Sequence, residues 1–211
     1  MKKLLPIALL IAASFGAQAA EFPDGKPVTI VVPFAAGGPT DRVARDLAEA
    51  MSRQLGGTPI VIDNAAGAGS TIGNAKVARA KNDGHTLLVT HVGMATTPVL
   101  YRKLSYNYET DFEYLGMIND VPMTLIGKPQ IEAKNLAELR DWIAKNPGKV
   151  NLGNAGVGSA SHLCGLLFQS ELKADMTTVP YKGTAPAIAD LLGGQIDLLC
   201  DQTTNTTSQI E

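Results

Sequence analysis

The sequence predicts an α/β protein of two lobes, each built on a mostly parallel sheet. Short apolar segments alternate with amphipathic segments along the chain, which is the order expected of repeated β–α–β units. Val28 to Val32 is a continuous β-branched run, as expected for a parallel strand that is covered on both faces. The alternation pauses near residue 120 and then starts again. We therefore expect a first lobe over 21–120 and a second over 121–211.

Residues 1–20 predict a secretory signal peptide. Lys2 and Lys3 precede an apolar run from Leu4 to Phe15, and Ala17-Gln18-Ala19 supplies small residues at cleavage spacing. This run is shorter than the roughly 20 apolar residues that a membrane helix needs. We therefore expect an exported protein, and regard a retained membrane anchor as the weaker alternative.

The first lobe begins with the strand Val28 to Val32, which Pro33 closes. Pro39 suits a first helical turn, and apolar residues then recur every four positions on one face until Gly56-Gly57 ends the helix. The same pattern predicts further elements in this order: a strand Ile60 to Ile62, a helix from a Ser70 cap to Ala80, a strand Thr86 to Thr90 and a polar loop His91 to Thr97. Strands near Phe112 to Ile118 and Met123 to Gly127 are expected to carry the chain across to the second lobe.

The second lobe repeats this order. Asn135 and Glu138 have near capping-box spacing at the start of a helix that Pro147-Gly148 ends. Ser159 is placed to cap the helix that follows the glycine loop. The remaining expected elements are strands Val150 to Leu152, Thr177 to Pro180 and Ile196 to Cys200, and a helix Thr184 to Leu192.

Composition excludes several classes of function. A net charge of −2, with only 5 Tyr, 5 Phe and 1 Trp, argues against a nucleic-acid partner, which would call for clustered Lys/Arg and stacking aromatics. The scattered histidines have no metal-ligand spacing, and no cofactor is expected. Export would allow Cys164 and Cys200 to form a disulfide, while two buried free thiols remain the alternative.

Glycine loops follow predicted strands in both lobes. In open α/β sheets, ligands bind beyond the carboxyl ends of the strands, where helix N-termini present backbone N–H groups without intrahelical partners. Such ends attract anions, so Gly37-Gly38 and Gly156-Val157-Gly158 are candidate carboxylate sites. The alternative is that these glycines only permit tight turns.

Several polar residues near these loops have two interpretations. Asp41 could contact a ligand amino group or could complement the dipole of its own helix. Asp201 could recognise an ammonium group or could cap the next element. Tyr181 could line the cleft between the lobes.

A secreted hydrolase is the rival class, because Ser159 and Ser161 lie beside His162. The Gly-x-Ser-x-Gly elbow is missing, and adjacent residues point to different faces of a helix. No catalytic residue is therefore predicted.

A co-linear series of motifs covers nearly the whole chain after the signal peptide and resembles the substrate-binding family of tripartite tricarboxylate transporters, also called Bug receptors. The matching segments are Val31 to Asp41, Gly67 to Gly69, Asp83 to Leu88, Asp111-Phe112, Gly158 to Leu163, Val179 to Gly183 and Asp190 to Asp197.

The resemblance implies a periplasmic-binding-protein-like architecture and a periplasmic receptor, expected to be a monomer. It would close around a small carboxylate (a di- or tricarboxylate, an acidic amino acid or an aromatic acid) and deliver it to the membrane subunits of the transporter. A receptor for an ABC transporter or a sensor kinase is the alternative. Members of the family continue for about another hundred residues by resemblance, so we expect an incomplete second lobe, without the segment that returns to the first.

Family contacts map onto Phe34 to Asp41, Asn154 to Ser159 and the region from Asp201. With the loop candidates, the predicted ligand-binding residues are Phe34, Ala36, Gly37, Gly38, Thr40, Asp41, His91, Asn154, Ala155, Gly156, Ser159, Tyr181 and Asp201.

Overall fold

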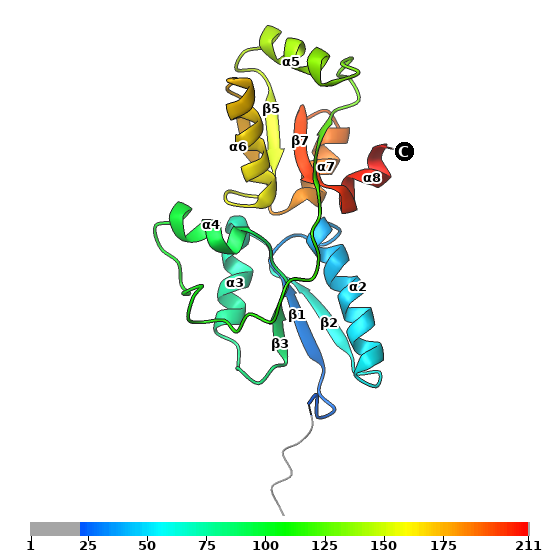
Figure 1. Ribbon diagram of the computed structural model, residues 1–211, viewed down its shortest axis with the longest axis vertical. Coiled ribbons are helices and arrows are strands. Elements are labelled where there is room, and N and C mark those ends of the chain that lie inside the picture. The colour runs from blue at the N-terminus through cyan, green and yellow to red at the C-terminus, as the bar shows by residue number, and fades with distance from the viewer. Residues whose placement is uncertain (1–21, 211) are drawn as a thin grey trace, which may run out of the picture.

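The computed structural model describes residues 22–210, so the predicted signal peptide lies outside the described residues. Two sheets with their helices form an upper and a lower lobe in Figure 1. One sheet contains strands before residue 90 and the other contains strands after residue 120. We keep the lobe boundary near residue 120 as a proposal. None of the helices within 22–210 is long and apolar enough to cross a membrane.

The first sheet has three parallel strands in the order β2-β1-β3: β1 (Val28–Val32), β2 (Ile60–Asn64) and β3 (Thr86–Leu88). In the central strand β1, the side chains of Val28, Ile30, Val31 and Val32 are all 0% exposed. The continuous apolar run is explained by this burial on both faces.

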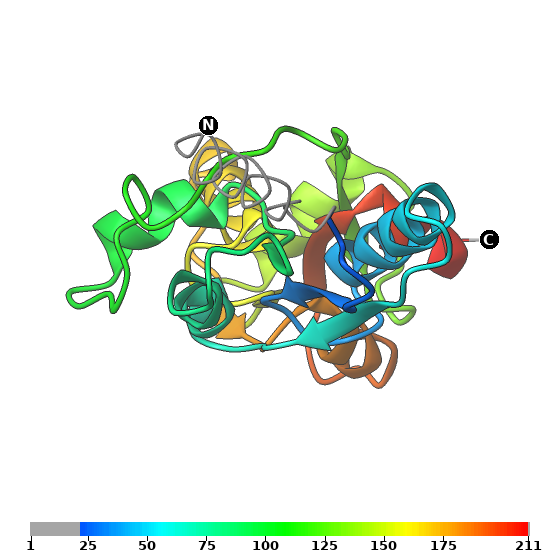
Figure 2. The ribbon, with the colours of Figure 1, turned by 90° about the horizontal axis from the view of Figure 1, so that it is seen from below.

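Helices α2 (Pro39–Gln54) and α3 (Thr71–Ala78) cover the first sheet from different sides, as the view from below shows (Figure 2). Two adjacent residues of β3 pack on opposite faces of this sheet, because successive side chains of a strand point to opposite faces. Leu87 packs into the cluster that includes Ala44 and Ala48 of α2. Leu88 packs into the cluster that includes Ala75 of α3.

The second sheet has four strands in the order β4-β7-β5-β6. They are β4 (Met123–Gly127), β5 (Asn151–Asn154), β6 (Thr177–Pro180) and β7 (Leu198–Gln202), and only β4 runs antiparallel to its neighbour β7. The α/β class with mostly parallel sheets is therefore confirmed. The helices of this lobe are α5 (Leu136–Lys145), α6 (Ala160–Leu172), α7 (Thr184–Leu192) and α8 (Thr203–Ile210).

Two of the three predicted helix caps are confirmed. Asn135 Oδ1 accepts the N–H of Glu138 at 3.0 Å, and Ser159 Oγ accepts the N–H of His162 at 3.1 Å. Ser70 was predicted wrongly as a side-chain cap. It is the last residue of the short helix η2 (Ala68–Ser70), has a φ of 92° and makes no cap bond, while its Oγ accepts a hydrogen bond from Asn74.

The prediction of a polar loop over His91 to Thr97 is wrong, because α4 (Gly93–Leu100) forms there. The Nδ1 atom of His91 accepts the N–H of Gly93 at 3.1 Å, which satisfies one of the free amides at the start of this helix. Met94 and Thr97 of α4 are buried in the first lobe. The polar residues that suggested a loop therefore face inward as well as outward.

The prediction of a strand near Phe112 to Ile118 is also wrong, since no strand forms between β3 and β4. This segment connects the lobes (Figure 1), and Leu115 and Met117 are 82% and 81% exposed. None of the strands in residues 22–210 pairs with this segment. An apolar sequence without a neighbouring strand has no ladder to join.

Candidate functional site

A small cavity lies where strand ends and helix N-termini of the two lobes meet. It leaves about 20 Å³ for the centres of water molecules, which is room for about one water. The wall is made by residues of both lobes, namely Phe34, Gly38, Pro39, Thr40 and His91 from the first, and Met123, Ala155, Ala160, Ser161, Thr184, Asp201 and Gln202 from the second.

Three helices begin at this cavity. Pro39 and Thr40 open α2, Ala160 and Ser161 open α6, and Thr184 is the first residue of α7. The N–H groups of a first helical turn have no intrahelical acceptor, and each helix N-terminus carries a partial positive charge. The cavity is therefore suited to bind an anionic group.

The two lobes touch beside these helix starts. The N–H of Ala35, which follows β1 by three residues, donates to the carbonyl of Lys182 in the second lobe at 2.9 Å. Next in the chain, Gly183 has a φ of +145°, and a Cβ there would lie 2.9 Å from the nitrogen of Ala35. Only glycine allows the backbones to approach this closely.

An aromatic pair forms the first-lobe side of the cavity. The rings of Phe34 and His91 stack with centroids 4.6 Å apart and planes 23° apart. Burial lowers the pKa of His91 to about 4, so the imidazole is neutral at neutral pH. His91 therefore adds polar and stacking surface to the cavity without a positive charge.

Asp201 supplies a buried carboxyl group to the opposite wall. It lies in β7 near its carboxyl end and is 1% exposed. Its Oδ2 atom accepts a hydrogen bond from Asn205 at 2.7 Å. Burial raises the pKa of Asp201, although hydrogen bonds from Asn205, Gln202 and Thr184 act in the other direction.

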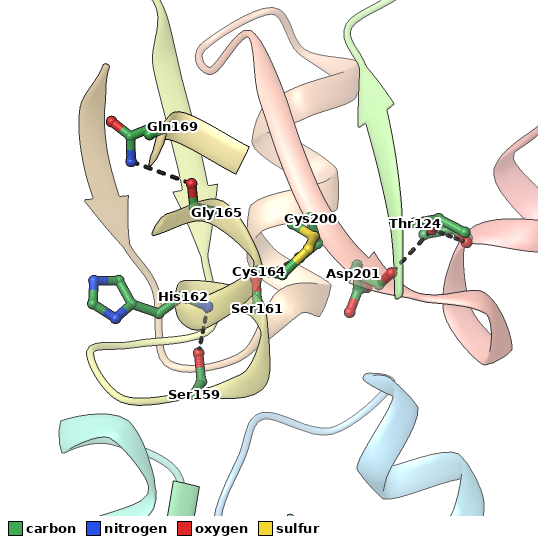
Figure 3. The surroundings of a disulfide bond; sticks show 10 residues. Thr124, Ser159, Ser161, His162, Cys164, Gly165, Gln169, Cys200 and Asp201 are labelled. Carbon is green, nitrogen blue, oxygen red and sulfur yellow. Dashed lines mark hydrogen bonds between the residues drawn. A yellow bond between two sulfur atoms is a disulfide. The ribbon is translucent and has the colours of Figure 1, made fainter. Parts of the chain in front are cut away.

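A disulfide joins α6 to the strand that carries Asp201 (Figure 3). Cys164 and Cys200 are bonded, with Cα atoms 6.1 Å apart, so the alternative of two free thiols is excluded. One turn earlier in α6, Ser161 Oγ donates to the carbonyl of Cys200 at 2.5 Å. Both links hold the start of α6 against β7.

The cavity contains six of the predicted ligand-binding residues, and the other seven lie outside its wall. Those in the wall are Phe34, Gly38, Thr40, His91, Ala155 and Asp201. Those outside it are Ala36, Gly37, Asp41, Asn154, Gly156, Ser159 and Tyr181.

The carboxylate of Asp41 bonds to residues of its own lobe and does not line the cavity. Its carboxylate accepts hydrogen bonds from Gly37 N at 2.9 Å, Arg45 Nε at 2.8 Å and Asn64 Nδ2 at 2.9 Å. Burial alone would raise its pKa, but these bonds outweigh burial and lower the pKa. Ala36 and Gly37 are exposed in the preceding loop.

The predicted residues of the second lobe that miss the cavity have internal partners. Asn154 Oδ1 accepts the N–H of Gly156 at 2.8 Å, and the buried Ser159 caps α6. Tyr181 donates to Asp190 at 2.7 Å, while burial and this bond raise its pKa to about 12.

The glycine loop Gly156 to Gly158 contacts the first lobe instead of the cavity. Thr96 Oγ1 donates to the carbonyl of Gly158 at 2.6 Å, and Tyr101 donates to the carbonyl of Val157 at 3.2 Å. These bonds bring α4 against the loop before α6, below α6 in Figure 1. The loop thus forms a second contact between the lobes, separate from the Ala35 contact.

Sequence reasoning missed half of the cavity wall: Pro39, Met123, Ala160, Ser161, Thr184 and Gln202. A signal existed for four of them, because they occupy the first turns of predicted helices. Met123 and Gln202 lie at the adjoining ends of β4 and β7, and these strands pair antiparallel. That pairing could not be inferred from the local sequence.

The arrangement does not assemble the Ser–His pair of a hydrolase. Ser161 Oγ donates to the carbonyl of Cys200, and Ser159 Oγ accepts from the backbone of His162. The His162 ring accepts the N–H of Gly158 at 3.3 Å. Neither serine hydroxyl donates to His162 within the described residues.

Residues 43–211 match the family described as tripartite tricarboxylate transporter family receptor. A UPF0065 protein from the TAR-I ttuE-ttuC' intergenic region of Agrobacterium vitis is 48% identical over 208 residues, which is 97% of this chain and 60% of the relative. The chain thus spans about 60% of the length of this relative.

Solved structures of similar proteins support the same family assignment. The periplasmic binding protein BugD has a TM-score of 0.84 at 53% identity, over 88% of this chain and 62% of that one. MatC from Rhodopseudomonas palustris with bound malate has a TM-score of 0.81 at 40% identity, over 88% of this chain and 63% of MatC. The chain belongs to the family of tripartite tricarboxylate transporter receptors.

Proposed function

We propose that the protein is a periplasmic receptor that captures a small carboxylate between its two lobes and delivers it to the membrane subunits of a tripartite transporter. The observation that carries this proposal is the convergence of three helix N-termini, those of α2, α6 and α7, on one cavity. Malate in the related MatC supports the same class of ligand.

The size of the cavity implies movement of the lobes. Space for about one water cannot admit even a four-carbon acid, so we propose that the lobes separate to let the ligand in. Several contacts between the lobes are single hydrogen bonds, such as Ala35 with Lys182 and Thr96 with Gly158, although Ala155 also packs into the apolar cluster of the first lobe. Contacts of this kind can break and form again at low cost.

Replacement of Thr184 tests whether amide groups hold the carboxylate. Proline is tolerated at the first position of a helix, so Thr184→Pro removes one cavity N–H without breaking α7. Thr184→Val loses the hydroxyl but keeps the N–H, and is the matched control. We expect calorimetry with small carboxylates to show an affinity about tenfold lower for the proline variant than for the valine variant.

A thermal-shift screen of small carboxylates, followed by calorimetry on each hit, tests the ligand class. Stabilisation without chemical change of the ligand supports a receptor. If no carboxylate stabilises the folded chain, or if it turns over esters, the proposal is wrong.

Co-purification with the membrane subunits tests the partner, and capture of an ABC transporter or a sensor kinase instead would assign the receptor to that system.

A further inference from the structure

Arg42 of the first lobe makes a hydrogen bond to the second lobe close to the cavity. Its Nη1 atom donates to the backbone carbonyl of Thr204 at 3.1 Å. The other hydrogen bonds that join the lobes within residues 22–210 are donated by Ala35, Thr96 and Tyr101, whose donor groups are neutral. Arg42 thus supplies the charged donor in this part of the contact between the lobes.

The two ends of this bond lie just outside the cavity wall. Arg42 is two residues after Thr40 in α2, and Thr204 is two residues after Gln202, where β7 leads into α8. Thr40 and Gln202 both line the cavity. A solute that draws these two walls together would therefore also bring Arg42 within reach of the Thr204 carbonyl.

Each end of the bond is fixed to its own lobe. Asp41, the residue before Arg42, is 2% exposed and is held within the first lobe by the hydrogen bonds described above. Asn205, the residue after Thr204, is 4% exposed and donates to Asp201 at 2.7 Å. Separation of the lobes must therefore break the bond, because neither end moves independently of its lobe.

The bond of Arg42 and the contact made by α4 lie on different sides of the molecule. Figure 1 shows α2 and α8 on one side and α4 on the other, and the view from below agrees (Figure 2). With the α4 contact alone, made by Thr96 and Tyr101, the lobes could still part at the side of α2 and α8. The bond of Arg42 closes this second side.

We propose that Arg42 is a latch that keeps the lobes closed over a bound solute and so sets the rate at which the solute is released. The inference rests on the proposed function, because it assumes that the cavity holds a solute between the lobes. Arg42 does not line the cavity, so it acts as a positioning residue. Its side chain is exposed, so water can replace the carbonyl when the lobes part, and the latch shifts the balance between open and closed states without locking it.

The variant Arg42→Met tests the latch, because it removes the donor and keeps a long unbranched side chain. Arg53→Met is the matched control. Arg53 is exposed on the same helix and pairs with Glu49 of that helix, so the control loses the same charge without touching the second lobe.

Hydrogen exchange of the Ala35 amide measures closure without a ligand, because its bond to Lys182 crosses between the lobes. We expect this amide to exchange about three- to tenfold faster in Arg42→Met, as for the loss of one hydrogen bond, and at an unchanged rate in Arg53→Met. The amide of Val89, which bonds to Val31 inside the first lobe, should not change in either variant. Equal exchange of the Ala35 amide in the two variants, or an equal acceleration at Val89, overturns the latch.

Stopped-flow kinetics with malate, the ligand of the related MatC, measure release directly. The dissociation rate should rise about three- to tenfold in Arg42→Met, while the association rate changes by less than about twofold. Slower association with unchanged dissociation would mean that Arg42 attracts the anion, and would overturn the latch. If malate does not bind the unaltered chain, exchange of the Ala35 amide still decides whether Arg42 holds the lobes together, so the latch and the proposed function fail separately.

Discussion

Gly69 of the first lobe lies directly against the carbonyl oxygen of Val157 in the second. A Cβ atom on Gly69 would lie 1.9 Å from that oxygen, which is far inside contact distance. Tyr101 donates to the same carbonyl, and Thr96 donates to the next one along the chain. The closeness of the lobes in this structure thus depends on the lack of a side chain at position 69.

Gly69→Ala should therefore hold the lobes apart. Gly69 has a φ of 58°, so alanine also costs about 1 kcal/mol of backbone strain. Gly56→Ala is the matched control, since Gly56 has a φ of +63° but nothing within 4 Å of the added Cβ. We expect small-angle scattering to give a larger radius of gyration for the first variant only. Equal radii for the two variants would contradict a steric limit at Gly69.

Asp41→Asn should destabilise the first lobe in a pH-dependent way. The pKa of Asp41 is lowered from 3.8 in the folded protein, so its stabilisation is present above that value and is lost as pH falls through the folded pKa. At neutral pH the free energy of unfolding of the variant should be lower by about 1–3 kcal/mol, because hydrogen bonds to a charged group are lost. Urea unfolding should show this difference narrowing as pH falls below 3.8. A difference that does not change with pH would rule out the charge of Asp41 as its cause.

His91→Asn should remove a part of the acid sensitivity. The pKa of His91 falls from 6.5 to about 4 on folding, so the unfolded chain binds the proton more readily and stability declines as pH falls below about 6.5. This contribution reaches about 3 kcal/mol near pH 4. Asparagine keeps an acceptor for Gly93 but does not titrate. Unfolding curves from about pH 7 to 4 should be flatter for the variant, and parallel curves would exclude His91 as the titrating group.

Loss of the disulfide should weaken the second lobe. The bond closes a loop with a sequence separation of 36, for which chain entropy gives roughly 3–4 kcal/mol of stabilisation. The double variant Cys164→Ser, Cys200→Ser should therefore unfold at lower urea concentration. A reducing agent should bring the unaltered chain to the level of the variant without changing the variant itself. A further loss in the reduced variant would mean that the reductant acts elsewhere.

Most of the fold could be predicted from local sequence patterns, and the failures have physical causes. The strand Val28 to Val32 and the helix from Thr184 to Leu192 were predicted with the bounds found, because periodicity and flanking glycines or prolines act locally. The helix α4 was missed because its first amide is satisfied by His91, a partner that standard capping patterns do not include. The segment near Leu115 has the composition of a strand, but pairing requires a neighbour that local composition cannot reveal.

The candidate site was predictable where it follows from a helix N-terminus, as at Gly38 and Thr40, or from the carboxyl end of a strand, as at Ala155 after β5. It was not predictable where the outcome depends on tertiary partners. Asp41 and Asp201 are both acidic residues beside loops, yet one is enclosed by Arg45 and Asn64 and the other faces the cavity. Only the tertiary contacts of each residue separate these two cases.

The covalent bond between Cys164 and Cys200 has a consequence for the thermodynamics of capture. It fixes the start of α6 beside Asp201 before any solute arrives, so one half of the recognition surface is rigid in advance. If the cavity captures a solute as proposed, the loss of conformational entropy for that half precedes association and does not weaken it. With the disulfide reduced, the same surface would have to become ordered during binding, which would lower the affinity.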